Sequence, residues 1–124
     1  MERLKRKIDC GAHFILTQPI YDSEVLERFL DRFPGTLPPI LGGILPLRSA
    51  RHAEFLHHEV PGITIPDHYR LRMAQASDPK SEGIAIACEI VDRIHDFVAG
   101  IYFMPPFERY DMVIEVIKSF SKEV

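Results

Sequence analysis

The stretch His13-Phe14-Ile15-Leu16-Thr17-Gln18, which runs into Pro19, is the clearest indication of the fold class. It is apolar until its last two positions, which is typical of a strand that is buried on both faces and emerges at a polar end. Asp22 and Ser23 then offer an N-cap for a helix. The apolar residues behind them share helical spacing and end before Pro34-Gly35: Val25, Leu26, Phe29, Leu30 and Phe33.

Strand and helix alternate to the end of the chain. Residues 39–46 (PILGGILP) predict a second buried strand, whose paired glycines indicate a bulge or a close backbone approach. Residues 100–104 (GIYFM) predict a third strand. Ser49 is expected to cap a helix that Pro61-Gly62 stops, and Pro66 is expected to open a shorter helix.

Two further helices are expected in the second half of the chain. A long one follows the polar loop 77–81 and has Gly100 as its C-terminal cap, and the last one begins at about Glu108. The residues expected to face inward on the four helices after residue 48 are Ala53, Leu56 and Val60, then Tyr69 and Met73, then Ile84, Ala87, Cys88, Val91, Ile94 and Val98, and finally Tyr110, Val113, Ile117 and Phe120.

This order predicts an α/β protein with a parallel sheet and right-handed crossovers. Three parallel strands that are apolar on both sides leave unpaired edges, which is a hazard for an isolated sheet. Residues 3–9 resemble the last turns of a helix without its beginning. We therefore expect residues 1–124 to form one domain that is part of a larger α/β architecture.

Composition narrows the function classes. The chain has 124 residues, a net charge of −3, 46% hydrophobic and 27% charged residues, which is ordinary for a soluble globular domain. The acidic balance argues against a nucleic-acid partner, and no apolar run reaches the roughly 20 residues of a membrane helix. We expect no signal peptide and a cytoplasmic protein whose Cys10 and Cys88 are buried, reduced thiols.

Candidate chemical groups lie at the predicted strand ends, where parallel α/β proteins collect function. Gln18 is the strongest candidate, because a carboxamide can both donate hydrogen bonds to the edge of a heterocycle and accept them from it. The alternative is that this strand-end amide forms its hydrogen bonds with a neighbouring loop. Asp22 is expected to be a helix cap. Four aromatic residues could either line a slot for a flat ligand or pack in the core: Tyr21, Tyr102, Phe103 and Phe107.

Two other sets of polar residues, a basic pair and three histidines, could have a ligand-binding role or only a structural one. Arg6 and Lys7 could pair with phosphates or simply form a solvated helix end. The histidines at 52, 57 and 58 match no ligand motif, so we expect no metal site.

Several stretches resemble the methylenetetrahydrofolate reductase family. Residues 4–18 (LKRKIDCGAHFILTQ) resemble that family's LKRKxxAGAxxxxTQ stretch, and residues 43–46 (GILP) resemble its next strand. Residues 46–56 and 61–66 are similar to the branch that fuses a homocysteine S-methyltransferase module to a reductase module. Residues 83–85 and 102–110 look like the closing helix, strand and helix of that branch.

The resemblance implies the carboxyl-terminal three β/α units of a (β/α)8 TIM barrel, which takes about 250 residues when complete. It also implies FAD as cofactor, NAD(P)H as co-substrate, and reduction of 5,10-methylenetetrahydrofolate to 5-methyltetrahydrofolate in one-carbon metabolism and methionine biosynthesis. The family's general-acid glutamate comes from the first barrel strand, which this chain lacks, so we expect the isolated chain to be inactive.

The resemblance also implies site residues by position. Gln18 would bind the folate pterin ring, and His52, Leu56, Phe107 and Arg109 would lie near the substrate. Arg6, Lys7 and Ala12 would lie near FAD.

Two other function classes stay open. The chain could be a non-catalytic subunit that completes a barrel with an N-terminal remainder or with itself, or an oligomerising α/β binding module. It could also be a methyltransferase piece, which ranks last because that chemistry needs zinc held by cysteines and the chain has no adjacent pair.

Overall fold

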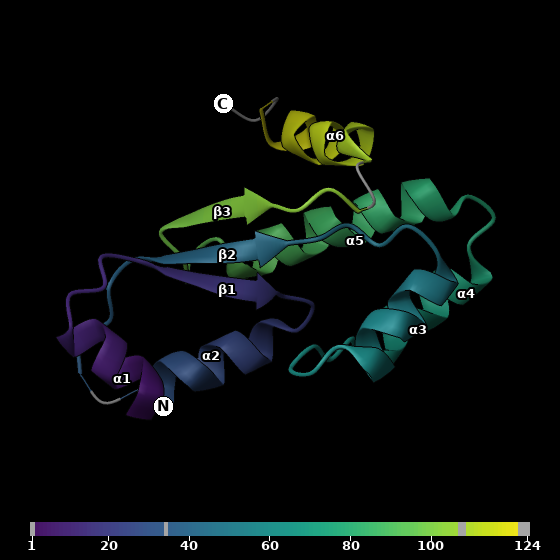
Figure 1. The fold of residues 1–124 in the computed structure, drawn as a ribbon. Coiled ribbons are helices and arrows are strands. Elements are labelled where there is room, and N and C mark those ends of the chain that lie inside the picture. Colours follow the sequence, from purple (N-terminus) through teal and green to yellow (C-terminus); the bar gives the residue numbers. More distant parts are fainter. Residues whose placement is uncertain (1, 34, 107–108, 122–124) are drawn as a thin grey trace.

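The sheet consists of three parallel strands in the order β1-β2-β3. β1 (Ile15–Pro19), β2 (Ile40–Ile44) and β3 (Gly100–Phe103) follow one another in the chain and in space, as Figure 1 shows. The computed structural model describes residues 2–33, 35–106 and 109–121. The predicted α/β class and the parallel pairing are confirmed.

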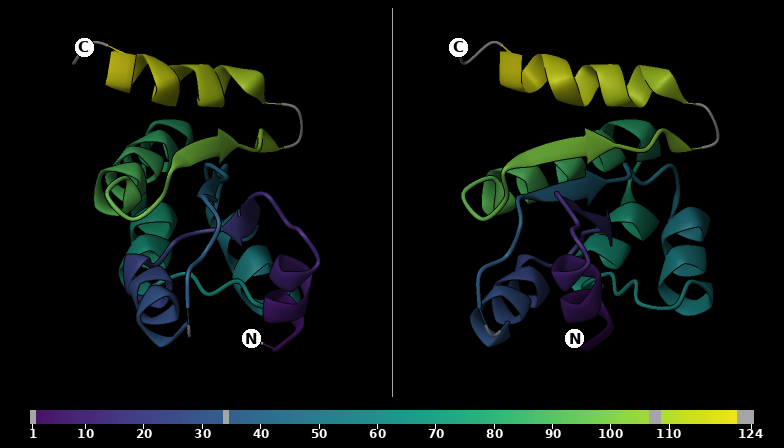
Figure 2. Two further views of the ribbon diagram at one scale, coloured as in Figure 1. Left: turned by 90° about the vertical axis from the view of Figure 1, so that its left-hand side faces the viewer. Right: turned by 60° about the vertical axis from the view of Figure 1, so that its left-hand side comes forward.

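Six helices are described around the sheet. α5 runs beside the sheet and contacts β2, and it also contacts α2, α4 and α6, so it is the central helix of the layer in Figure 1 and Figure 2. The bounds are α1 (Glu2–Asp9), α2 (Ser23–Arg32), α3 (Ala50–Glu59), α4 (Asp67–Gln75), α5 (Pro79–Ile94) and α6 (Tyr110–Ser121). No helix in the described ranges is long and apolar enough to cross a membrane.

Side-chain caps begin three of these helices. The Asp22 carboxylate accepts the backbone N–H of Glu24 at 2.9 Å, so Asp22 is the helix cap that we expected. Ser49 Oγ accepts the N–H of His52 at 3.1 Å. Asp78 caps α5, whose first residue is Pro79. The expected loop at 77–81 is correct for residues 77–78 and wrong for 79–81, because a proline at the first helical position lets the helix begin at Pro79.

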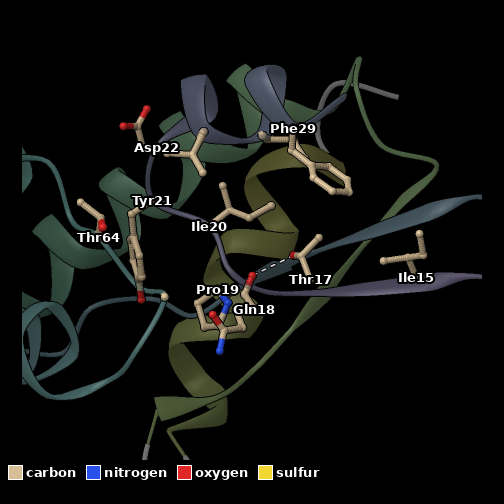
Figure 3. A pocket seen from close by; sticks show the side chains of 12 residues that line it. Ile15, Thr17, Gln18, Pro19, Ile20, Tyr21, Asp22, Phe29 and Thr64 are labelled. Carbon is tan, nitrogen blue, oxygen red and sulfur yellow. Dashed lines mark hydrogen bonds between the residues drawn. The ribbon is translucent and has the colours of Figure 1, made fainter. Parts of the chain in front are cut away.

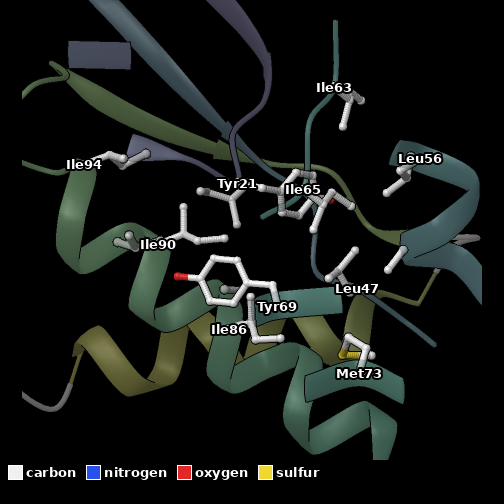
Figure 4. Packing of buried hydrophobic residues seen from close by; sticks show 14 of the residues in the cluster. Tyr21, Leu47, Leu56, Ile63, Ile65, Tyr69, Met73, Ile86, Ile90 and Ile94 are labelled. Atoms are coloured by element: carbon white, nitrogen blue, oxygen red, sulfur yellow. The ribbon is translucent and has the colours of Figure 1, made fainter. Parts of the chain in front are cut away.

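The core lies between the sheet and the helices that follow β2. Figure 4 shows Tyr21 beside Ile65, and Tyr69 of α4 beside Ile86 and Ile90 of α5, all in one hydrophobic cluster. α5 comes very close to the segment after β2, because a Cβ on Gly83 would lie only 1.8 Å from the Leu47 carbonyl oxygen. The predicted inward residues Ala53, Leu56, Tyr69, Met73, Ala87, Val91 and Ile94 are buried.

Burial of every strand on both faces is a wrong expectation. β2 is mostly buried, but in β1 the side chains alternate, and Leu16 is 55% exposed. Gly42 faces α5, where an added Cβ would contact Ile94 and Val98. The side of β1 that carries Leu16 lies away from this helix layer, so an apolar sequence does not ensure burial there.

Other expectations about faces need correction. α5 ends at Ile94, and Gly100 begins β3 without a positive φ, so Gly100 does not cap a helix. In α6 the buried residues are Met112 and Val116, whereas Ile117 is 44% exposed. Because α6 is apolar on more than one side, periodicity alone could not select the side that α5 covers.

The cysteine expectation holds only in part. Cys88 is half-buried, with its sulfur 3.2 Å from Ser119 Oγ, but Cys10 is exposed. Both thiols are free. Cys10 follows the last residue of α1 and lies in the turn before β1, where solvent reaches it.

Candidate ligand groove at the end of β1

A β-bulge shapes the carboxyl end of β1. Leu16 pairs with Leu41 and Pro19 pairs with Gly43, so three steps along β1 match two along β2. Thr17 Oγ1 fills the gap, because it accepts the N–H of Gly43 at 2.9 Å and donates to the Gln18 carbonyl at 2.8 Å. The predicted bulge is therefore in β1, opposite the glycines. Bulges re-aim side chains near functional sites, and here the re-aimed residue is Gln18.

A groove of about 450 Å3 runs along this end of β1. Its size suits a small ring compound. Figure 3 shows an apolar part at Ile15 and Phe29 and a more polar part at Gln18 and Thr64. The full lining is Ile15, Thr17, Gln18, Pro19, Ile20, Tyr21, Asp22, Val25, Leu26, Phe29, Gly62 and Thr64.

Gln18 is exposed and lies against the turn after α3. A Cβ on Gly62 would come within 2.6 Å of the Gln18 Oε1, and Gly62 has a positive φ of 86°. Only glycine adopts this backbone without strain, and its bare Cα leaves room for the carboxamide. The amide of Gln18 is therefore exposed to solvent, with Gly62 directly beside it on one side.

Two partly buried hydrogen bonds support the groove. The Tyr21 hydroxyl donates to the Leu45 carbonyl at 2.7 Å, and burial raises the pKa of Tyr21 well above its usual value. His57 Nδ1 accepts the N–H of Ile65 at 3.1 Å and so ties the segment that carries Gly62 to α3. The Tyr21 hydroxyl and the His57 ring nitrogen are both engaged in hydrogen bonds to the backbone, so we interpret the two side chains as structural supports rather than reacting groups.

The residues expected near FAD do not reach this groove. Arg6 and Lys7 are exposed in the last turn of α1, which joins β1 at its amino end, whereas Gln18 is at its carboxyl end (Figure 1). Ala12 is half-buried in the connection, and its N–H donates to the Lys7 carbonyl at 3.2 Å. Their cofactor role stays a prediction.

His52 and Leu56 lie on the inner side of α3. His52 is buried, and its Nδ1 accepts the Arg48 N–H at 3.0 Å. Burial and then the charge of Arg48 lower the pKa of His52. Leu56 is 6% exposed and belongs to the hydrophobic cluster. Neither residue lines the groove, so the structure does not bring them together with Gln18, and their substrate role stays a prediction.

Of the predicted substrate residues after β3, Arg109 does not line the groove with Gln18. Phe107 lies outside the described residues. Arg109 Nε donates to Asp111 at 3.2 Å, and Lys80 pairs with the same carboxylate at 2.7 Å. Hydrogen bonds from Arg109 and then Lys80 lower the pKa of Asp111 far below its usual value. Arg109 is thus engaged with Asp111, and the Lys80–Asp111 ion pair joins the starts of α5 and α6.

The aromatic slot is not assembled by the described aromatic residues. Tyr21 lines the groove but is only 4% exposed, and Phe103 is packed against the core cluster. Tyr102 lies on the other side of the sheet, where an added Cβ on Gly43 would meet it, and its hydroxyl donates to the Thr17 carbonyl. Burial raises the pKa of Tyr102.

Sequence reasoning missed several residues of the groove. Thr17 was visible as a polar strand end, but its role depends on a register shift that periodicity does not reveal. Gly62 and Thr64 belong to a turn that Pro61-Gly62 signals, yet only the tertiary fold carries that turn to Gln18. Among the described residues, no group of three His, Cys, Asp or Glu side chains could hold a metal ion.

The fold and groove define a parallel α/β protein with a ligand-sized site at a strand end. A family model described as methylenetetrahydrofolate reductase matches residues 1–119. The chain therefore belongs to the methylenetetrahydrofolate reductase family.

Curated relatives agree with this assignment. Methylenetetrahydrofolate reductase 2 of Saccharomyces cerevisiae is 37% identical over 84 residues, which are 63% of this chain and 13% of that protein. Methylenetetrahydrofolate reductase 1 of Schizosaccharomyces pombe is 32% identical over 90 residues, 68% of this chain and 14% of that protein. The chain thus spans only a small part of the length of these relatives.

A solved structure shares the fold. An uncharacterized protein from Clostridium thermocellum, which binds two copies of 5-methyl-5,6,7,8-tetrahydrofolic acid, matches with a TM-score of 0.74 and 18% identity. The match covers 99% of this chain and 48% of that one.

Proposed function

We propose that this chain forms the folate-binding part of a flavin-dependent methylenetetrahydrofolate reductase. The observation that carries the proposal is the exposed carboxamide of Gln18, aimed by the bulge into a groove of about 450 Å3. Its N–H groups and oxygen match the alternating acceptors and donors on the edge of a pterin ring. The family membership and the folate bound by the Clostridium thermocellum protein support a folate as the ligand.

We further propose that the three β/α units are the carboxyl-terminal part of a (β/α)8 barrel. Among the residues that the structure describes, the parallel order β1-β2-β3 leaves both outer strands with a free edge, as in a barrel cut open. In a closed barrel a neighbouring unit would cover the apolar part of the groove at Ile15, Val25 and Phe29. The part at Gln18, Gly62 and Thr64 would stay open at the barrel mouth, where such enzymes bind substrates.

The flavin is assigned to the complete barrel rather than to these residues alone. FAD supplies the hydride transfer in this reaction, with NAD(P)H as the reductant that we propose. The described residues do not fit a complete flavin site, because Arg6 and Lys7 lie at the opposite end of β1 from the groove. Their contact with the cofactor phosphates stays a prediction of the family resemblance.

Folate binding by the 124-residue chain tests the proposal. Isothermal titration with 5-methyltetrahydrofolate is expected to show saturable binding, and Gln18→Ala is expected to weaken it about tenfold or more, because a polar pair to the ring is lost. Gln75→Ala is the matched control, since Gln75 is exposed at the end of α4 and outside the groove. Equal affinities of Gln18→Ala and the unchanged chain would contradict the proposal.

A non-catalytic, barrel-completing role is the second candidate. The exposed Leu16 and the free edge of β1 favour it, because a partner strand would cover both. Light scattering of the purified chain distinguishes the candidates. A stable dimer or larger oligomer supports barrel completion by self-association, whereas a soluble, folded monomer that binds the folate argues against it.

A further inference from the structure

Tyr102 reaches from β3 across β2 to β1. Tyr102 pairs in register with Gly43, and a Cβ on Gly43 would lie 2.8 Å from the Tyr102 hydroxyl oxygen. Because Gly43 has no side chain, the tyrosine ring can lie over the middle strand. Its hydroxyl then donates to the backbone carbonyl of Thr17.

The two peptide groups that flank Gln18 are held by side chains. Tyr102 binds the carbonyl of Thr17, which belongs to the peptide before Gln18. Thr17 Oγ1 binds the carbonyl of Gln18, which belongs to the peptide after it, and the same oxygen accepts the Gly43 N–H at 2.9 Å. Pro19 restricts the backbone of Gln18 further, because a residue before proline is confined to extended conformations.

We infer that Tyr102 is a positioning residue for folate recognition, acting through the Thr17 carbonyl on the direction of the Gln18 side chain. This inference rests on the proposed function, because it takes Gln18 as the group that binds the ring. Fixing both flanking peptides fixes the Cα–Cβ direction of Gln18. A preorganised carboxamide loses less conformational entropy when it binds than a mobile one.

A purely structural role of Tyr102 makes a different prediction. If the tyrosine only fills space, then Tyr102→Phe keeps the ring and should alter neither the Gln18 backbone nor ligand affinity. If the hydroxyl positions Gln18, then Tyr102→Phe frees the Thr17 carbonyl while the ring still lies over Gly43. Tyr110→Phe is the matched control, because Tyr110 is 61% exposed at the start of α6.

The first measurement needs no ligand. Two-dimensional 15N NMR of the full chain follows the backbone amide and side-chain NH2 of Gln18, together with hydrogen exchange at Gly43. We expect Tyr102→Phe to shift the Gln18 signals. Because the variant loses the hydrogen bond from Tyr102 to the Thr17 carbonyl, Thr17 should hold the Gly43 N–H less firmly, and hydrogen exchange at Gly43 should accelerate about fivefold or more. Signals that match those of Tyr110→Phe would overturn the inference.

The second measurement is a double-mutant cycle on binding of 5-methyltetrahydrofolate. Tyr102→Phe is expected to weaken binding about fivefold in the unchanged chain and less than about twofold in the Gln18→Ala background. The same loss in both backgrounds would overturn the inference, because Tyr102 would then act without Gln18. If the unchanged chain binds no folate, the proposed function fails, and the NMR measurement alone decides the role of Tyr102.

Discussion

His57 in α3 holds Ile65 of the following segment, with Nδ1 accepting the backbone N–H at 3.1 Å. Between these two residues the chain passes Gly62 and Thr64, both of which line the groove. The groove therefore depends on a histidine that does not line it.

Replacing His57 by alanine is expected to loosen this segment. Loss of one hydrogen bond should lower the free energy of unfolding by about 1 kcal/mol, and hydrogen exchange at Ile65 should accelerate. Urea unfolding and amide exchange measure the two effects. His13→Ala is the control, because His13 is exposed in the connection before β1, away from α3. Equal exchange at Ile65 in both variants would show that His57 does not hold the segment.

Gly62→Ala is expected to impair ligand binding in the groove, because Gly62 lies directly against the Gln18 side chain. A methyl group here would meet the Gln18 oxygen and occupy a backbone of positive φ, so strain of about 1 kcal/mol and a displaced carboxamide should follow. Affinity for 5-methyltetrahydrofolate should fall several-fold. Gly35→Ala shares the positive φ but has no atom within 4 Å of the added Cβ. The prediction is wrong if both variants lose stability equally and neither loses affinity.

The local signals of the chain predicted its elements well. Residues 13–33 carry an apolar run, a cap at Asp22 and a helical stripe, and the structure contains β1 and α2 there. Gln18 at a strand end could be selected for the same reason, since parallel strands end at one edge of a sheet. These features depend on neighbours in sequence.

What the sequence did not reveal depends on contacts between distant elements. The bulge at Thr17 arises from pairing with Gly43, and the approach of Gly62 to Gln18 requires the path of the chain after α3. The exposed side of β1 and the exposed stripe of α6 look apolar in sequence but lie away from α5. Periodicity reports that a face is apolar and not which element covers it.

Two buried tyrosines should respond oppositely to loss of the hydroxyl. Tyr21 donates to the Leu45 carbonyl at 2.7 Å, whereas the hydroxyl of Tyr69 has no hydrogen-bond partner among the described residues. Tyr21→Phe should therefore lower the free energy of unfolding by about 1 to 2 kcal/mol, and Tyr69→Phe should leave it unchanged or raise it by about 1 kcal/mol. Urea unfolding of the two variants measures this. A larger loss in Tyr69→Phe would reveal a partner for its hydroxyl.

His52 should make stability depend on pH. Burial, and then the charge of Arg48, holds the pKa of His52 below its ordinary value of 6.5 in the folded chain. The unfolded chain thus takes up a proton first as pH falls below 6.5, so the free energy of unfolding is highest above this pH and decreases toward the lower folded pKa.

The slope attributable to this histidine is at most about 1.4 kcal/mol per pH unit. Urea unfolding between about pH 7.5 and about pH 5 measures it, and His52→Gln should flatten the dependence because glutamine does not titrate. His68→Gln, at an exposed position, is the control. If His52→Gln and the unchanged chain lose stability in parallel, the proton is taken up elsewhere.

Gly83→Ala provides a test of how closely α5 approaches the segment after β2. In an ordinary helix interior this change stabilises by about 1 kcal/mol, since alanine has the higher helix propensity. Here the new Cβ would lie 1.8 Å from the carbonyl oxygen of Leu47, a backbone atom that cannot rotate away. The separation of α5 from the segment after β2 that must follow should cost about 3 kcal/mol, so a net loss of about 2 kcal/mol is expected. Ala74→Gly, at an exposed position of α4, measures the propensity term alone and should lose about 1 kcal/mol. A gain of stability in Gly83→Ala would show that α5 does not pack this closely on Leu47.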